Sequence, residues 1–207
     1  MSIVWTMIGG IIAGLVATFI YQRLSSPSLS LSVGCEGWQH IDTMFDVLRV
    51  EVTNREHRRF VRWFLRRSAA HSCHAQVQLS TSEDSAILWQ AVWLPRYRPA
   101  SIPAAERGPG LSFGERPRET LDIDGGARPV IRIAAKRVGE SVCYIAITGD
   151  NGALTLGQEL AIGDYPLKIE ITCLNSSPVT KKFVLENKGV ATDLETLARS
   201  FALKGPL

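Results

Sequence analysis

The sequence predicts an all-β fold, an antiparallel sandwich with an N-terminal transmembrane helix and a short C-terminal helix. An uncharged apolar run begins the chain, and apolar residues repeat at helical spacing near its end. Between the two, short segments alternate apolar and polar residues with a period of two. Such alternation indicates strands with one buried face and one solvated face. Eight or nine such strands without long helices between them favour a sandwich.

The composition agrees with a folded domain that carries one attachment. The chain has 207 residues and a formal net charge of +3, with 21% charged and 45% hydrophobic residues. These values exclude a wholly disordered chain. Four cysteines are too few for a small disulfide-stapled scaffold. The mean hydropathy of +0.06 is slightly high for a soluble domain, and the N-terminal run accounts for it.

The first element expected is a membrane anchor over residues 1–24. Residues 3–21 carry no charge. As a helix they would extend about 28 Å, close to the ~30 Å hydrocarbon core of a bilayer. Trp5 and Tyr21 stand at the two ends of the run, where aromatic rings favour the membrane interface. Residues 3–21 are therefore expected to contact membrane lipid. The alternatives are a buried helix and a cleaved signal peptide, although only Met1 and Ser2 precede the run.

The orientation of the anchor depends on a single cation. Arg23 lies two residues after the end of the apolar run, and the next arginine is Arg49. Because Lys and Arg that flank a span favour the cytoplasmic side, we expect a single-pass protein of the inner or plasma membrane with a cytoplasmic globular domain.

Two glycines of the run have the spacing of a helix–helix contact. Gly10 and Gly14 form a small-xxx-small pair, which lets two membrane helices approach closely. The pair predicts a homodimer through the transmembrane helix. The alternative is the ordinary glycine content of membrane helices.

A single β-sandwich domain is expected over residues 25–190. Its acidic residues, Asp46 and Asp122 among them, mostly lie beside turn residues and are expected to be solvated. The expected strands cover residues 29–35, 47–53, 73–79, 87–93, 121–123, 130–135, 142–148, 167–173 and 179–186.

One strand favours the immunoglobulin-like version of the sandwich. Tyr165 follows Gly163 at the start of a late strand, as the corner tyrosine of that fold does, and would bond back to the preceding turn. The series Leu48-x-Val50-x-Val52-x-Asn54, Ala70-x-x-Cys73-x-Ala75, Trp93 and Gly163-x-Tyr165 resembles small prokaryotic membrane-anchored proteins with an Ig-like domain and no assigned activity. The resemblance covers most of the chain after the anchor and implies an architecture, without any catalytic residue.

The last element expected, within residues 191–207, is a helix from about Asp193 to Leu203. Thr192 would cap it, and Glu195 would reach back to complete a capping box. Leu197 and Phe201 belong to its apolar repeat. The helix would dock on the sandwich or bind a partner.

The most distinctive segment is the run of arginine and aromatic residues from Arg55 to Arg67. As a helix, it would place most arginines on one sector and the large apolar residues on the other, the pattern of a basic amphipathic helix in a membrane interface. As a strand and its loop, it would be purely structural. A nucleic-acid site is the least favoured reading, because the charge of the whole chain is modest. The residues expected to contact membrane or a partner are Arg58, Arg59, Phe60, Arg62, Trp63, Phe64 and Arg66.

A second candidate segment is the Pro/Gly-rich loop at residues 94–119, which is long for a compact domain and therefore functional or mobile. Its glycines lack the Lys-Ser/Thr ending of a phosphate loop.

The cysteines are interpreted first as core residues, and Cys73 and Cys143 have a spacing near that of an Ig-type pair, as other pairs could. In the cytoplasm they would be reduced. His74 and Cys73 alternate along a strand, so they would not easily share a metal ion.

The motifs favour placement over catalysis. The sequence has no Gly-x-Ser-x-Gly elbow, no His-Glu-x-x-His pair and no complete nucleotide loop. We therefore expect a non-catalytic interaction or scaffold module that needs no cofactor or metal and engages another protein or lipid. The alternative is a ligand- or nucleotide-responsive sensor or an enzyme that uses the 94–119 loop.

Overall fold

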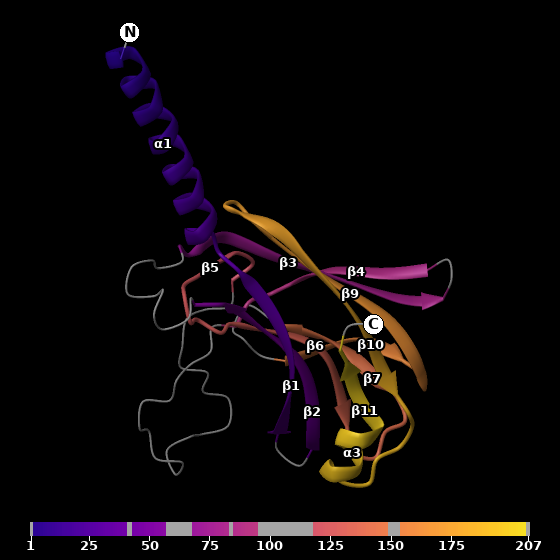
Figure 1. Ribbon diagram of the computed structural model, residues 1–207. Helices are drawn as coiled ribbons and strands as arrows, with labels where there is room; N and C mark the ends of the chain where they lie inside the picture. Colours follow the sequence, from indigo (N-terminus) through magenta and orange to yellow (C-terminus); the bar gives the residue numbers. More distant parts are fainter. Residues whose placement is uncertain are drawn as a thin grey trace, which may run out of the picture.

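The computed structural model describes residues 2–40, 43–56, 68–82, 85–94, 118–148 and 154–205. Helix α1 (Ser2–Ser25) projects away from the strands in Figure 1. Its side chains from Met7 onward are exposed, with Ile11, Leu15 and Phe19 each more than 60% accessible. By length and composition, Met7–Ser25 is able to cross a membrane, although an N-terminal signal sequence meets the same criteria.

Within the described residues, the strands form two antiparallel sheets. The first has the order β1-β2-β6-β7-β8, so that a hairpin from the start of the domain pairs with a later three-stranded meander. A β-bulge between Leu48 and Arg49 interrupts the pairing of β2 with β6. The strands of this sheet are β1 (Leu29–His40), β2 (Thr43–Asn54), β6 (Val130–Arg137), β7 (Cys143–Thr148) and β8 (Leu154–Leu160).

The second sheet has the order β11-β10-β9-β3-β4, and the short strand β5 also pairs with β3. Its central pair, β3 and β9, joins segments that lie about 90 residues apart, since Val77 is the register partner of Ile169. The strands are β3 (Ala70–Ser82), β4 (Ser85–Ala91), β5 (Leu121–Ile123), β9 (Gly163–Cys173), β10 (Ser176–Asn187) and β11 (Phe201–Lys204).

One hydrophobic cluster holds residues of both sheets, including Val50 from β2 and Ile169 from β9. The predicted alternation is confirmed most clearly on β3, where Ala75, Val77 and Leu79 are buried and the intervening glutamines are not. The second sheet thus buries one apolar face, whereas β2 and β6 of the first sheet bury side chains on both faces, with Phe45, Val47, Ala135 and Ala146 in a separate smaller cluster. Burial of such side chains is the main stabilising contribution expected for this domain.

Two strands lie where none was expected. β8 follows the turn-rich residues near position 150, and its Leu154 and Leu156 are only half-buried, so its alternation is weak. β11 occupies the end of the expected C-terminal helix and pairs with β10, with Phe201 opposite Asn187. The expected helix to Leu203 is therefore wrong. α3 spans Leu194–Ser200, and the chain then continues as the edge strand of the second sheet.

The cap of α3 also differs from the expected one. Asp193 is the N-cap residue, and its carboxylate accepts a hydrogen bond from the backbone N–H of Thr196 at 2.8 Å. The hydroxyl of Thr196 in turn accepts from the backbone N–H of Asp193 at 3.2 Å. Asp193 and Thr196 thus replace Thr192 and Glu195 in the capping box, one residue later than the sequence reading.

Tyr165 makes the hydrogen bond to the preceding turn that the sequence predicted. The hydroxyl of Tyr165 donates to the carbonyl oxygen of Ala161 at 3.0 Å, four residues upstream, across the turn that leads into β9. Burial raises the pKa of this phenol, which keeps it in the donating form.

Candidate functional site

The junction between the helix and the domain is tied by hydrogen bonds. The carbonyl oxygen of Ser25, the last residue of α1, accepts from the backbone N–H of Ser68 at 2.8 Å and from its hydroxyl at 2.9 Å. Only three residues, 26–28, separate α1 from β1. The helix therefore ends directly on the strand layer, and Figure 1 shows the C-terminal end of α1 near β3 and β5.

Asn54 organises the same end of the domain from within. Its side chain is completely buried and uses both of its polar atoms. The amide oxygen accepts from the backbone N–H of Ser28 at 3.0 Å, and the amide nitrogen donates to the carbonyls of Ser68 at 3.0 Å and Ile123 at 3.1 Å. One amide thus joins the linker, the start of β3 and the end of β5.

The arginine-aromatic residues Arg58, Arg59, Phe60, Arg62, Trp63, Phe64 and Arg66 lie outside the described residues. The residues that flank them are described, and both flanks are held beside the end of α1. Arg55 donates its backbone N–H to the carbonyl of Ser28 at 2.8 Å, and Ser68 bonds to Ser25. The segment therefore leaves and rejoins the domain at the end that carries the helix.

Gly10 and Gly14 lie on exposed turns of α1, and a methyl group added at either one would meet no atom within 4 Å apart from its chain neighbours and the adjacent helix backbone. This face of the helix is open, as a helix–helix contact requires.

Most of the Pro/Gly-rich loop, residues 95–117, also lies outside the described residues. Its two ends pair with each other, because Trp93 and Arg118 exchange backbone hydrogen bonds of 2.9 and 3.3 Å. The indole nitrogen of Trp93 donates to the carbonyl oxygen of Cys73 at 2.8 Å. The side chain of Trp93 is fully buried, so the loop starts and ends on a rigid part of the core.

The cysteines pair differently from the Ig-type spacing. Cys73 of β3 forms a disulfide with Cys173 of β9, with the Cα atoms 4.2 Å apart. The two residues are adjacent in register within one sheet, since the neighbouring pair is His74 and Thr172. Cys143 is free and buried, and burial raises the pKa of its thiol to about 11. The spacing of Cys73 and Cys143, one of several possible pairs, therefore does not correspond to the disulfide.

Lys136 is a buried cation that the sequence reading missed. Its side chain is fully inaccessible, and its amine donates to the side-chain oxygen of Asn187 and to the carbonyl oxygen of Gly189. Desolvation lowers the pKa of the amine. The amide nitrogen of Asn187 donates to three further carbonyl oxygens, those of Ser141, Leu160 and Ala161. Asn187 therefore links the turn between β6 and β7 with the connection between β8 and β9. Through the amine of Lys136, it is also linked to Gly189, which follows β10.

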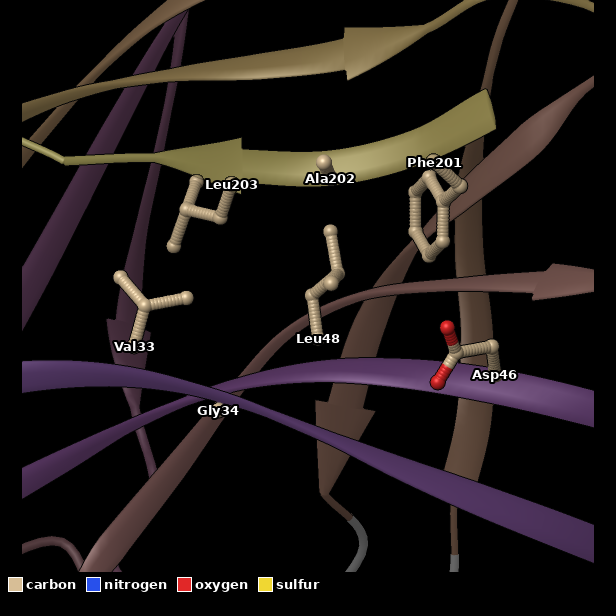
Figure 2. Close-up of a pocket in the computed structure, with 7 residues that line it drawn as sticks. All are labelled: Val33, Gly34, Asp46, Leu48, Phe201, Ala202 and Leu203. Carbon is tan, nitrogen blue, oxygen red and sulfur yellow. The ribbon is translucent and has the colours of Figure 1, made fainter. Parts of the chain in front are cut away.

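A cavity of about 220 Å³ lies between the edge strands of the two sheets, and Figure 2 shows the residues around it. Asp46 is its acidic residue. It was expected at a solvated turn, but β2 begins at Thr43, and Asp46 is only 5% exposed. Burial raises the pKa of its carboxyl group. The lining residues are Val33 and Gly34 of β1, Asp46 and Leu48 of β2, and Phe201, Ala202 and Leu203 of β11.

A further polar cluster lies on the surface near α1. Asp122 accepts the backbone N–H of Ser72 at 2.7 Å, and its carboxylate is 3.4 Å from the ring of His71. The Ser72 amide is the larger cause of the lowered pKa of Asp122, and His71 is the next. Ser72 has a left-handed φ of 48°, so Asp122 stabilises an unfavourable backbone conformation. Among the described residues, no group of three His, Cys, Asp or Glu side chains is placed to hold a metal ion.

Comparison with protein-family models, with curated proteins and with solved structures finds no match.

Proposed function

We propose that this protein is a membrane-anchored, non-catalytic interaction or scaffold module that holds a β-sandwich at the membrane surface, where it engages another protein or lipid. The observation that carries the proposal is the way α1 meets the domain. The helix is apolar and exposed from Met7 to Leu24, and its last carbonyl is bonded twice to Ser68. An exposed apolar helix of this length is unfavourable in water and favourable in a bilayer.

Removal of residues 1–24 tests the anchor. The truncated chain should appear in the soluble fraction and retain the circular dichroism of β-sheet, because none of the described side chains of α1 belongs to the buried cluster. Replacement of residues 3–21 by an unrelated apolar helix should return the protein to the membrane. A truncated chain that pellets and has lost its β signal would contradict the proposal. The intact mass of the protein from membranes distinguishes a retained anchor from a cleaved signal sequence.

The arginine-aromatic residues are the proposed contact with lipid headgroups. Support comes from the flanks of the segment, since Ser68 bonds to Ser25 at the end of α1 and Arg55 bonds to Ser28 in the linker that follows it. Several arginines close to anionic headgroups would each contribute about 1 kcal/mol.

The lipid contact has a direct test once the truncated domain is shown to fold. Changing Arg58, Arg59, Arg62 and Arg66 to Ser should abolish sedimentation of that domain with phosphatidylglycerol vesicles. The matched control removes the same charge from exposed positions elsewhere. Unchanged sedimentation of the first variant, or equal loss in both, would contradict the contact. The control variant changes Arg128, Lys182, Lys188 and Arg199 to Ser.

Two features favour opposite orientations of the anchor. Arg23, in the last turn of α1, favours a cytoplasmic domain. The Cys73–Cys173 disulfide favours an oxidising compartment, because such bonds are rare in the cytosol. A single arginine is a weak determinant, whereas the disulfide joins two central strands. We therefore favour a domain on the oxidising side of the membrane, the reverse of the expectation from Arg23.

The immunoglobulin-like assignment is part of the proposal. The order β4-β3-β9-β10 corresponds to the C′-C-F-G strands of that fold, and Tyr165 has the corner contact. Two features differ from it. The disulfide lies within one sheet and does not join the two sheets. In the first sheet, β6, β7 and β8 lie side by side in the order in which they follow along the chain. The corresponding Ig sheet has the order A-B-E-D, in which strand D comes before strand E in the chain but lies beyond it in the sheet.

A homodimer through α1 is the proposed assembly, with Gly10 and Gly14 at the contact. Their Cα atoms are open to approach, as noted above. Changing both glycines to Leu should abolish crosslinking of the full chain in membranes, because the larger side chains would separate the helices. Crosslinking that persists would exclude this face.

A further inference from the structure

The cavity between β1, β2 and β11 contains one charged group in an otherwise apolar lining. In Figure 2 the carboxylate of Asp46 points into the space bounded by Leu48 and Phe201. Leu48, Phe201 and Leu203 are each less than 8% exposed, whereas Val33 at the rim is 39% exposed. The site is therefore a partly open apolar pocket with an acid on its inner wall.

The described part of the chain supplies Asp46 with no cation. Lys136 is its register partner on β6, but the amine of Lys136 is bound to Asn187 and Gly189. On β1, Gly37 faces Asp46 in the register and carries no side chain. The backbone N–H of Val47 is the polar contact that offsets some of the cost of burial. A carboxylate in this setting is unfavourable unless a cation enters the pocket.

We propose that this pocket binds a small organic ammonium ion, with its cationic group on Asp46 and its hydrocarbon part against Leu48, Phe201 and Leu203. An ammonium group would supply the missing counter-charge and hydrogen-bond donors. The apolar walls would remove the hydrocarbon part from water. Cavities of about 150 Å³ admit benzene, so about 220 Å³ has room for a slightly larger molecule, such as an arylmethylamine. The site goes beyond the anchoring role, because it needs neither lipid nor a protein partner.

Ligand-observed ¹⁹F NMR on the full chain in nanodiscs tests the proposal. The probe is the 4-fluorobenzylammonium ion, compared with 4-fluorobenzyl alcohol and 4-fluorobenzoate, which have similar shapes and different charges. The ammonium ion should broaden in the presence of protein and bind at least tenfold more tightly than the alcohol, while the benzoate should not bind. Empty nanodiscs correct for partition into lipid. Equal binding of the ammonium ion and the alcohol, or binding of neither, would overturn the proposal.

Two variants locate the binding. Asp46→Asn keeps the shape of the side chain and removes its charge, and should weaken ammonium binding at least tenfold without affecting the alcohol. Asp124→Asn, at an exposed turn, is its matched control. Val33→Phe fills the rim and should block both compounds, whereas Leu88→Phe on the exposed edge strand β4 should block neither. Ammonium binding that survives Asp46→Asn or Val33→Phe would place the ligand elsewhere. Thermal unfolding of each variant confirms that it is folded.

Discussion

Asp46 destabilises the protein at neutral pH in the absence of a ligand. Its pKa is raised in the folded state, so the folded protein holds the proton more tightly than the unfolded chain does. The contribution of Asp46 to stability is therefore greatest below the ordinary value of 3.8 and is lost as the pH rises through the raised pKa. Asp46→Asn should raise the free energy of unfolding by about 1 kcal/mol at pH 7, with no gain at pH 3. Urea unfolding at the two pH values checks this. A variant that is less stable at pH 7 would contradict it.

Asn187 should be among the most sensitive polar positions. Asn187→Ala removes four hydrogen bonds and leaves the amine of Lys136 with one fewer acceptor in a buried site. We expect a loss of about 3 kcal/mol. Asn175 is the matched control, because it also bridges two segments, bonding to His71 and Ala69, but lies exposed. Asn175→Ala should cost about 1 kcal/mol or less. Equal losses in the two variants, measured by urea unfolding, would show that burial does not decide the cost.

The residue-level surprises share a physical cause. Asp46 and Lys136 lie next to apolar residues in their strands. In such a segment, a charged residue is expected on the solvated face, and only the position of the opposite sheet shows that these two are buried. Asn54 and Asn187 each end a strand, where asparagine usually forms a turn. Their burial depends on carbonyl groups from segments far along the chain. No local pattern predicts such partners.

At the level of elements, the period of two predicted most of the strands, because a sheet with one buried face requires it. The spacing of apolar residues gave a wrong prediction for β11, which was expected to be helical. Leu197 and Phe201 lie four residues apart and match a helix. The edge of β10 offers unpaired backbone groups, however, and Phe201–Lys204 satisfies them as a strand. The tertiary partner therefore determined the conformation of this segment.

The disulfide joins elements that are distant along the chain. Cys73 and Cys173 are 100 residues apart, so closing this loop should contribute about 4 kcal/mol by restricting the unfolded chain. Reduction, or Cys173→Ala, should lower the free energy of unfolding of the folded domain by that amount. Cys143→Ala is the control, since its thiol is free, and reductant should still destabilise that variant. A urea midpoint that reductant does not move in the wild-type protein would contradict the prediction.

The whole molecule allows a direct test of the favoured orientation. If the domain lies in an oxidising compartment, protein from native membranes should carry the Cys73–Cys173 bond. Labelling of the denatured chain with polyethylene-glycol maleimide should then show two additional labels after reduction. Cys173→Ala should show no additional label. Equal labelling of the wild-type protein before and after reduction would place the domain in the cytoplasm.

The short junction after α1 has a consequence for how the protein meets its partners. Three residues can extend only about 10 Å, and Ser25 is bonded to Ser68 in addition. If α1 spans a membrane as proposed, this short connection would keep the domain at a nearly constant height above the bilayer, and the domain would diffuse in two dimensions. A partner in the same membrane would meet it by lateral diffusion, with its binding face already at the right level. A partner from solution would have to approach the bilayer itself.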